Sequence, residues 1–194
     1  MARSAKSKPA RSATSSSYVA LLRGINVGGK NKLPMADLAA MFCDAGCEDV
    51  RTYIQSGNVI FRVNPKNAER IPRVISDKIA ASLGLRVPVV IRTSGELREV
   101  AASNPFLADA DPQSLHVAFL ADLPEKRRAA ALDVKRSPGD SFKLLGREIY
   151  LCLPNGVART KLTNAYFDST LATMSTLRNW RTVLKLLEIT QAME

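Results

Sequence analysis

The chain has 194 residues, of which 46% are hydrophobic and 24% charged, and its formal net charge is +10. This composition is ordinary for a globular protein, and the length suits one domain or two small ones with a buried core. No apolar run approaches the roughly 18 to 20 residues that span a bilayer, so the sequence predicts no transmembrane helix and no membrane partner.

The N-terminal segment, residues 1–17, is basic and rich in Ser and Ala, with four cations and no acid. It has no apolar run of signal-peptide type, and so little apolar surface predicts a disordered tail. Such a tail either contacts nucleic acid or is simply solvated. Three cysteines without a secretory leader favour free thiols and a cytoplasmic location.

The pattern of apolar residues in the first half of the chain predicts strands and helices, each followed by turn residues. "SG" at Ser56–Gly57 suits a hairpin turn, and Pro34 suits the start of a helix. We expect strands at 18–24, 50–55, 58–63 and 86–92, and helices at 33–46 and 68–84. This β-α-β-β-α-β order is that of the ferredoxin-like, split-βαβ fold.

The second half starts with a helix over 93–103, because Thr93 and Glu96 have capping-box spacing. We then expect a strand at 115–121, a helix at 124–133, a hairpin about Gly146, and helices at 161–170 and 177–193. The sequence thus predicts an α+β fold of two subdomains, each somewhat ferredoxin-like, with an antiparallel sheet and helices on one face. We expect them to span residues 18–92 and 93–194.

The loop after the first strand, within "LLRGINVGGKNKLPM", raises a functional question. Gly24, Gly29 and Lys30 have the G-x-x-x-x-G-K spacing of a nucleoside-triphosphate loop. Asn31 stands where that motif has Ser or Thr, and Pro34 places the helix too late. A glycine-rich turn with left-handed backbone angles is the alternative.

Topology favours an anion site at this loop. In a split-βαβ sheet the first two strands are parallel with the third between them, so the loop lies beside the "QSGN" turn. Backbone amides and cations near a helix start attract negative charge. The predicted ligand-binding residues are Arg23, Asn26, Gly28, Gly29, Lys30, Asn31, Gln55, Ser56 and Asn58.

The second half repeats the theme, with cations where helices are expected to begin. Arg159 and Lys161 precede one helix, and Arg178 is predicted in the first turn of the last. Cations there oppose the helix dipole, unless a bound anion compensates or the helix starts are misplaced. Lys161, Asn164, Arg178 and Asn179 are the predicted second-subdomain ligand residues.

Catalytic and metal chemistry have little support. His116 lies in an apolar strand and reads as structural, and no G-x-S-x-G turn is present. Cys43 and Cys47 read as packed thiols near a helix end. Cys43 and Cys47 could share a helix face, but zinc needs about four ligands and the only His, His116, lies far away in sequence, so no metal is predicted. The sequence indicates no particular cofactor and leaves open whether the protein is an enzyme.

Several long segments together resemble a known family. "YVALLRGINVGGKNKLPMADL", "VRTYIQSGNVIF", "VPVVIRTSGEL", "NPF", "TKLTN" and "LRNWRTVLKL" are similar to the bacterial domain-of-unknown-function family 1697. The resemblance covers nearly all of the chain after Ser17. It implies two α+β subdomains, each somewhat ferredoxin-like. It points to no particular biochemical activity and leaves the function open.

Three functions therefore stand as hypotheses. The first is binding of an anionic, phosphate-bearing small molecule or nucleotide at the first strand–helix loop. The second is phosphoryl or nucleotidyl transfer on such a ligand, with Lys30 and Arg178 stabilising charge. The third is nucleic-acid binding through the basic tail and the basic body. The sequence leaves the oligomeric state open.

Overall fold

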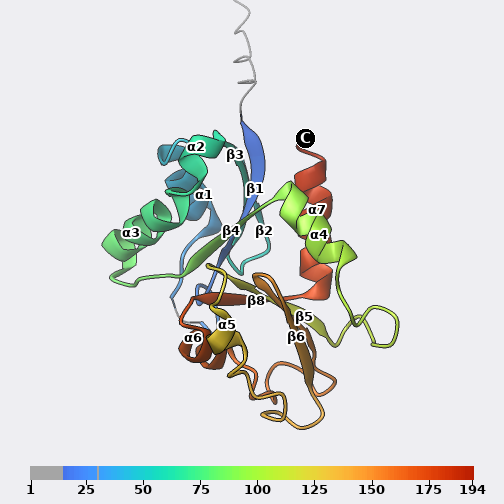
Figure 1. Ribbon diagram of the computed structural model, residues 1–194. Helices are drawn as coiled ribbons and strands as arrows, with labels where there is room; N and C mark the ends of the chain where they lie inside the picture. The colour runs from blue at the N-terminus through green and yellow to red at the C-terminus, as the bar shows by residue number, and fades with distance from the viewer. Residues whose placement is uncertain (1–14, 30) are drawn as a thin grey trace, which may run out of the picture.

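The computed structural model describes residues 15–29 and 31–194. Lys30 and residues 1–14, most of the predicted tail, lie outside the described residues. The protein is an α+β structure with two four-stranded antiparallel sheets (Figure 1). The α+β fold with two subdomains is therefore confirmed.

The first sheet has the strand order β2-β3-β1-β4. Its strands are β1 (Ser16–Leu22), β2 (Glu48–Tyr53), β3 (Asn58–Val63) and β4 (Val89–Thr93). Helices α1 (Met35–Asp44), α2 (Pro65–Ala68) and α3 (Ile71–Leu83) connect them. Because β3 is antiparallel to both β1 and β2, those two strands are parallel, as the split-βαβ order predicts.

The second sheet repeats this topology, with the order β6-β7-β5-β8. Its strands are β5 (Leu115–Leu120), β6 (Ser141–Leu145), β7 (Glu148–Cys152) and β8 (Ser175–Asn179). Helices α5 (Lys126–Ala129) and α6 (Asn164–Leu171) are its connections. Each half ends in one further helix, α4 (Ser94–Ala102) and α7 (Trp180–Gln191).

Strand β8 corrects the prediction of a last helix over 177–193. Leu177 fits the apolar stripe of that helix by spacing, yet it pairs with Ala118 in the sheet. Helix α7 begins only at Trp180, and the Asn179 side chain caps it by accepting a hydrogen bond from the Thr182 N–H at 2.8 Å. The second half is therefore a full β-α-β-β-α-β unit followed by a helix.

Other predicted boundaries are also wrong. The helix expected over 124–133 is only the short α5, Lys126–Ala129. The tail was expected to extend to residue 17, but Ser16 and Ser17 already belong to β1, opposite Val63 and Arg62. The helix expected over 161–170 begins at Asn164, because the Thr163 hydroxyl caps it. By contrast, the capping box of Thr93 and Glu96 at the start of α4 is confirmed.

Side chains from alternate positions of β1 enter two different cores. Tyr18, Ala20 and Leu22 pack against α1 and α3. Val19 and Leu21 face the other way, towards α4, α7 and the second sheet. Helices α4 and α7 therefore lie between the two sheets (Figure 1), and α6 covers the far face of the second sheet. Among the described residues, no helix is long and apolar enough to cross a membrane.

We predict that Gly57→Ala destabilises the protein more than Gly28→Ala. Both glycines have positive φ, +74° and +59°, so both substitutions carry a left-handed backbone penalty of about 1 kcal/mol. Only at Gly57 would the new Cβ lie 2.8 Å from the Leu22 Cβ, which adds about 1–3 kcal/mol of overpacking. Urea unfolding of both variants measures the difference, and equal losses would contradict the predicted clash.

Candidate functional site

Two asparagine side chains fold the first loop. Asn26 and Asn31 both have positive φ, 54° and 51°. Asn26 donates to the Leu33 carbonyl and accepts from the Leu33 N–H, both at 2.8 Å. Asn31 donates to the Gly24 carbonyl at 2.7 Å. These side-chain amides satisfy main-chain groups that have no main-chain partner in a tight loop, so their role is to stabilise the loop conformation.

The predicted position of this loop beside the β2–β3 turn is confirmed. The Leu22 N–H donates to the Gly57 carbonyl at 2.8 Å, and the Ile25 side chain lies against Gly57. Gly28, Gly29 and Gln55 are exposed to solvent. Lys30, the central cation of the prediction, lies outside the described residues.

Arg23 contacts the second subdomain. Its Nη1 lies 2.8 Å from the Asp168 carboxylate in α6 and 2.7 Å from the Ser175 carbonyl in β8. The Ser175 hydroxyl donates to the Asn164 side chain at 3.1 Å, so Arg23 and Asn164 share one network. The carboxylate of Asp168 neutralises the charge of Arg23, which makes this arginine a contact between subdomains.

Arg178 lies in strand β8, not in the first turn of a helix, so the expected conflict with the helix dipole does not arise. Its guanidinium crosses into the first subdomain. It donates to the Asn58 side chain and to the Leu22 carbonyl, both at 2.6 Å, and to the Ser56 and Gly57 carbonyls at 3.3 Å. Asn58 is held in turn by its own bonds to the Tyr53 carbonyl and the Ser56 hydroxyl.

This guanidinium is a buried cation surrounded by neutral acceptors. Its remaining bonds go to the Thr176 hydroxyl and the Leu177 carbonyl, both at 2.8 Å. None of the carboxylates in the described part of the chain lies within 4 Å of it. Burial accordingly lowers the pKa of Arg178 to about 10. Residues of the "LLRGIN", "QSGN" and "LRNW" segments therefore meet around one side chain.

Arg92 in β4 is the counterpart of Arg178 in the first subdomain. Each arginine is the penultimate residue of its strand. Each donates a hydrogen bond to the other subdomain, at the carbonyl that ends its first strand, Leu22 of β1 or Leu120 of β5. Arg92 reaches the Leu120 carbonyl at 2.7 Å and the Arg147 carbonyl at 3.2 Å. Its Nε binds Glu148 at 2.8 Å, where Arg178 binds Asn58. The two subdomains thus exchange equivalent arginines, but only Arg92 has a carboxylate partner.

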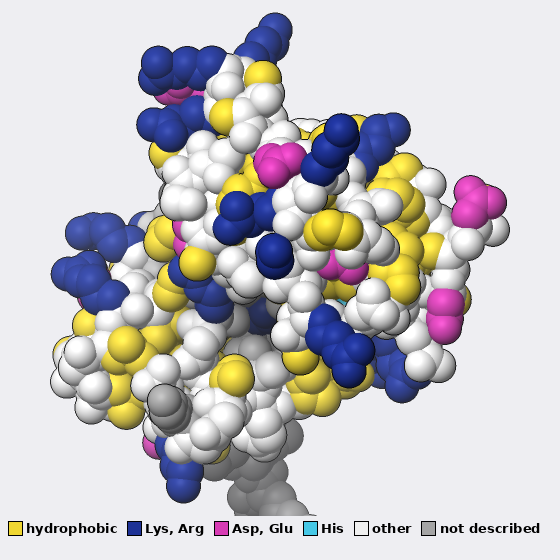
Figure 2. All heavy atoms as spheres, turned by 90° about the horizontal axis from the view of Figure 1, so that it is seen from below, with side chains coloured by type: hydrophobic (Ala, Val, Ile, Leu, Met, Phe, Trp, Pro, Cys, Tyr) yellow, Lys and Arg dark blue, Asp and Glu magenta, His cyan; other side chains and the backbone are white. Residues whose placement is uncertain are grey.

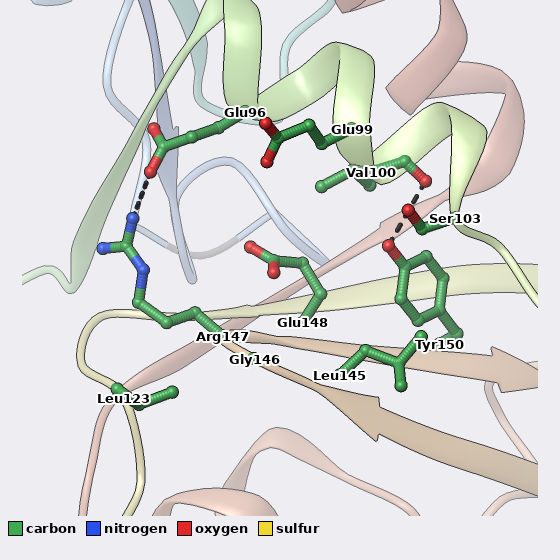
Figure 3. Close-up of a pocket in the computed structure, with 10 residues that line it drawn as sticks. All are labelled: Glu96, Glu99, Val100, Ser103, Leu123, Leu145, Gly146, Arg147, Glu148 and Tyr150. Carbon is green, nitrogen blue, oxygen red and sulfur yellow. Dashed lines mark hydrogen bonds and ion pairs between the residues drawn. The ribbon is translucent and has the colours of Figure 1, made fainter.

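A cavity of about 420 Å³ lies beside the Arg92 contact, between α4 and the β6–β7 hairpin (Figure 3). Its acidic side chains are Glu96, Glu99 and Glu148. Glu96 is paired with Arg147 and Glu148 with Arg92. Burial and the nearby Glu148 carboxylate raise the pKa of Tyr150, on the same wall, to about 12. The paired groups support the junction between the subdomains.

Two of the other predicted second-subdomain residues, Lys161 and Asn179, do not join this junction. Lys161 is exposed, three residues before α6, and its N–H and carbonyl bind Ser137 and Arg136. Arg159 lies in the same exposed loop, so neither cation stands at a helix start. Asn179 is used as the cap of α7. The predicted two-subdomain cluster therefore separates into a junction and a distant loop.

The described residues contain no group of three or more potential metal ligands. His116 is buried and its Nδ1 donates to the Ser114 carbonyl at 3.0 Å, while burial lowers its pKa. Burial raises the pKa of Cys47 to about 12, which keeps the thiol protonated and unreactive. Cys43 is exposed, so only Cys47 is packed as predicted.

The sequence interpretation missed a strongly basic segment. Residues 126–161 contain nine Lys or Arg and three Asp or Glu, a net charge of +6. Residues 15–125 contain twelve of each, and residues 162–194 three of each, so both are neutral. All of the net charge after the tail therefore lies in 36 residues. Counting charge along the chain, rather than in total, would have found this segment.

Five cations of this segment, on the α6 side of the second sheet, form what we name the basic face. All are exposed, and no described carboxylate lies within 4 Å of them. They are Lys126, Lys135, Arg136, Arg159 and Lys161. Lys143 of β6 is also exposed, but it lies on the other face of the sheet, the face of Leu145 and Tyr150. Figure 2 views the molecule from the end that carries α5 and β6, where Lys and Arg side chains are spread over the surface with some Asp and Glu side chains among them. Like charges gathered without partners favour an anionic partner.

Comparison with protein families matches residues 16–150 to the family described as "Protein of unknown function (DUF1697)". The chain belongs to this family. A solved structure, that of the conserved bacterial protein SP0830 from Streptococcus pneumoniae, shares the fold of this DUF1697 chain with a TM-score of 0.68. The match covers 91% of this chain and 99% of that chain at 22% sequence identity. The comparison with curated proteins gives no match.

We predict that Arg178→Met destabilises the protein by about 3–5 kcal/mol, since it leaves Asn58 and buried carbonyls of the junction without a donor. Arg181→Met, three residues along, is the control. Arg181 is exposed and should cost no more than about 0.5 kcal/mol. Chemical denaturation measures both, and similar losses would show that the junction does not depend on Arg178.

Proposed function

We propose that this DUF1697 protein binds nucleic acid through the basic face. The observation that carries the proposal is the segregation of charge. The protein after residue 14 is neutral except for residues 126–161, and the cations of the basic face, which lie in this segment, have no carboxylate partners among the described residues. Phosphates of a nucleic-acid backbone would neutralise these cations and release counterions, which is the main driving force of such binding.

Two loops of the basic face are fixed in position, which favours binding because less side-chain and loop freedom is lost. The buried Ser137 hydroxyl accepts a hydrogen bond from the Lys161 N–H at 3.0 Å. Arg136 Nε donates to the Lys161 carbonyl at 3.1 Å. The loops that carry Lys135 and Arg159 are therefore joined side by side, although they lie more than 20 residues apart in the sequence.

Arg136 is also held by an aromatic ring. Its guanidinium carbon lies 4.0 Å from the centre of the Tyr166 ring, while the Tyr166 hydroxyl accepts a bond from the Asp133 N–H at 2.8 Å. A stacked guanidinium keeps its edge available for phosphate, which arginine binds through two parallel hydrogen bonds. This arrangement supports phosphate contact at Arg136.

The distribution of the cations favours an extended partner. They come from α5, the α5–β6 connection and the β7–α6 loop, and all five are exposed. A single phosphorylated metabolite would contact only a few of them. A nucleic-acid backbone presents charges at regular short intervals and matches a spread surface. Neutral surroundings elsewhere in the described chain would confine binding to this face.

We predict salt-dependent binding of a labelled 20-nucleotide RNA and of duplex DNA, measured by fluorescence anisotropy between 50 and 200 mM KCl. The double variant Lys135→Gln/Arg159→Gln should bind more weakly and should lower the slope of log K against log salt by about 2, or about 1 per lost phosphate contact.

The matched control is Lys66→Gln/Arg70→Gln, which removes the same charge from exposed positions at α2 and just after it, in the first subdomain. This control should bind like the parent protein. Equal weakening by both double variants would contradict a specific role of the basic face. Loss of binding only on deletion of residues 2–14 would instead assign it to the basic tail.

The first loop is a second candidate, for a phosphate-bearing small molecule or for phosphoryl or nucleotidyl transfer on it. The exposed Gly28 and Gly29 backbone and the exposed Lys32 and Gln55 support it. Arg23, Asn26, Asn31, Asn58 and Arg178 already hydrogen-bond within the protein, so fewer groups support this site than the basic face. Stabilisation by one nucleotide that Lys30→Ala abolishes would favour it, and magnesium-dependent turnover would favour transfer.

A further inference from the structure

A second anion site is suggested far from the basic face, at the N-terminus of α4. A cavity of about 390 Å³ is bounded there by Ser15, Ser16 and Ser17, by Arg62 of β3, and by the first turn of α4. It lies where the described chain begins, at the opposite end of the molecule from α5 and β6 (Figure 1).

Ser94, the first residue of α4, is among the residues that bound this cavity, and its hydroxyl is unsatisfied. The residue is only 3% exposed, and its Oγ has no hydrogen-bond partner among the described residues. A buried hydroxyl without a partner costs about 1–3 kcal/mol. A bound acceptor in the cavity would remove that cost.

The first turn of α4 supplies further donors. Thr93 Oγ1 accepts the hydrogen bond of the Glu96 N–H, but the Ser94 and Gly95 N–H groups precede it and have no intrahelical acceptor. These groups carry the positive end of the helix dipole. Glu96 itself completes the capping box and pairs with Arg147, and it is not among the residues that bound this cavity.

Arg62 supplies a positive charge. It donates to the Met193 carbonyl at 2.9 Å and to the Ser15 carbonyl at 2.8 Å, and no described carboxylate lies within 4 Å of it. The carboxylate at the cavity is Glu194, whose charge is offset by Arg98 at 3.2 Å. A cation fixed by two carbonyls, beside unpaired helix N–H groups, is suited to an oxyanion.

The start of α7, the equivalent position in the second subdomain, has different residues from the start of α4. Trp180 and Arg181 stand at the start of α7 where Ser94 and Gly95 stand at the start of α4. A cavity of about 350 Å³ lies there too, but it is lined by Trp180, Arg181 and Leu184. Only the first subdomain combines small residues, an unsatisfied hydroxyl and an arginine at this place among the described residues.

We propose that the α4 N-terminus binds a single phosphate group, with Arg62, the Ser94 hydroxyl and the Ser94 and Gly95 N–H groups as its donors. The phosphate belongs either to free inorganic phosphate or to a phosphomonoester. The site is separate from the basic face and does not depend on nucleic-acid binding. The serines of β1 form the opposite wall of the cavity.

The test is an NMR titration of the full chain with inorganic phosphate and, separately, with O-phosphoserine. Saturable shifts of the Ser94 and Gly95 amide signals are expected. Tighter binding of phosphoserine than of inorganic phosphate would identify the monoester as the ligand form, and the reverse order would identify the free ion. No saturable shift of these amides with either probe would overturn the proposal.

Gly95→Asp is the decisive variant. Gly95 is exposed, and a new Cβ there would come no closer than 3.8 Å to its neighbours, so the side chain fits. An acid in the first turn also favours the helix, so the variant should fold. Its negative charge should weaken phosphate binding at least tenfold, whereas Gly95→Ala should leave binding within about twofold.

Arg62→Gln should also weaken phosphate binding by about tenfold or more, through loss of the charge-assisted contact. Lys135→Gln/Arg159→Gln should leave the Ser94 and Gly95 shifts unchanged, so failure of the nucleic-acid proposal and failure of this one are distinguishable. Unchanged phosphate affinity in Gly95→Asp would contradict a site at the α4 N-terminus.

Discussion

The arrangement of the two subdomains depends on a buried cation that has no carboxylate. Removing an arginine from water costs several kcal/mol unless its donors are satisfied. Arg178 meets this requirement by binding the Asn58 side chain and the Leu22 and Gly57 carbonyls of the other subdomain. Those acceptors exist only when the first loop and the β2–β3 turn are both in place. The cation therefore couples the fold of one subdomain to the position of the other.

The exchange of arginines gives the molecule a pseudo-symmetric construction. Arg92 makes the equivalent contacts from the first subdomain to the second, at the Leu120 and Arg147 carbonyls. The symmetry is broken at one position, where Glu148 stands in the place of Asn58. The Arg92 junction thus contains an ion pair, whereas the Arg178 junction contains a cation bound by neutral amide and carbonyl oxygens. The two matching topologies suggest a duplicated unit, although the sequence shows no repeat at the level of residues.

The motif residues of the first loop and of β8 make their hydrogen bonds within the protein. Arg23, Asn26, Asn31 and Arg178 bind other parts of the protein, so the prominent "LLRGIN" and "LRNW" segments have a structural role that needs no ligand. The cations of the basic face, by contrast, are not among the residues that form that junction. The basic face and the buried arginines share no residue, so the proposed binding and the stability of the junction depend on different parts of the protein. The proposed α4 site at the other end would add a second, independent contact with phosphate.

The sequence by itself determined the local features of this fold. The capping box at Thr93, the hairpin about Gly146 and the β-α-β-β-α-β order of the first half all follow from short-range patterns. This order of elements also predicted that the first loop lies beside the β2–β3 turn, because parallel strands β1 and β2 end at the same edge of the sheet. Only the tertiary structure decided that residues 175–179 form a strand, because Leu177 fits a helical stripe equally well and pairing with β5 overrides it. It alone also decided that Arg178 is buried and Arg181 exposed, because burial depends on acceptors more than 100 residues away.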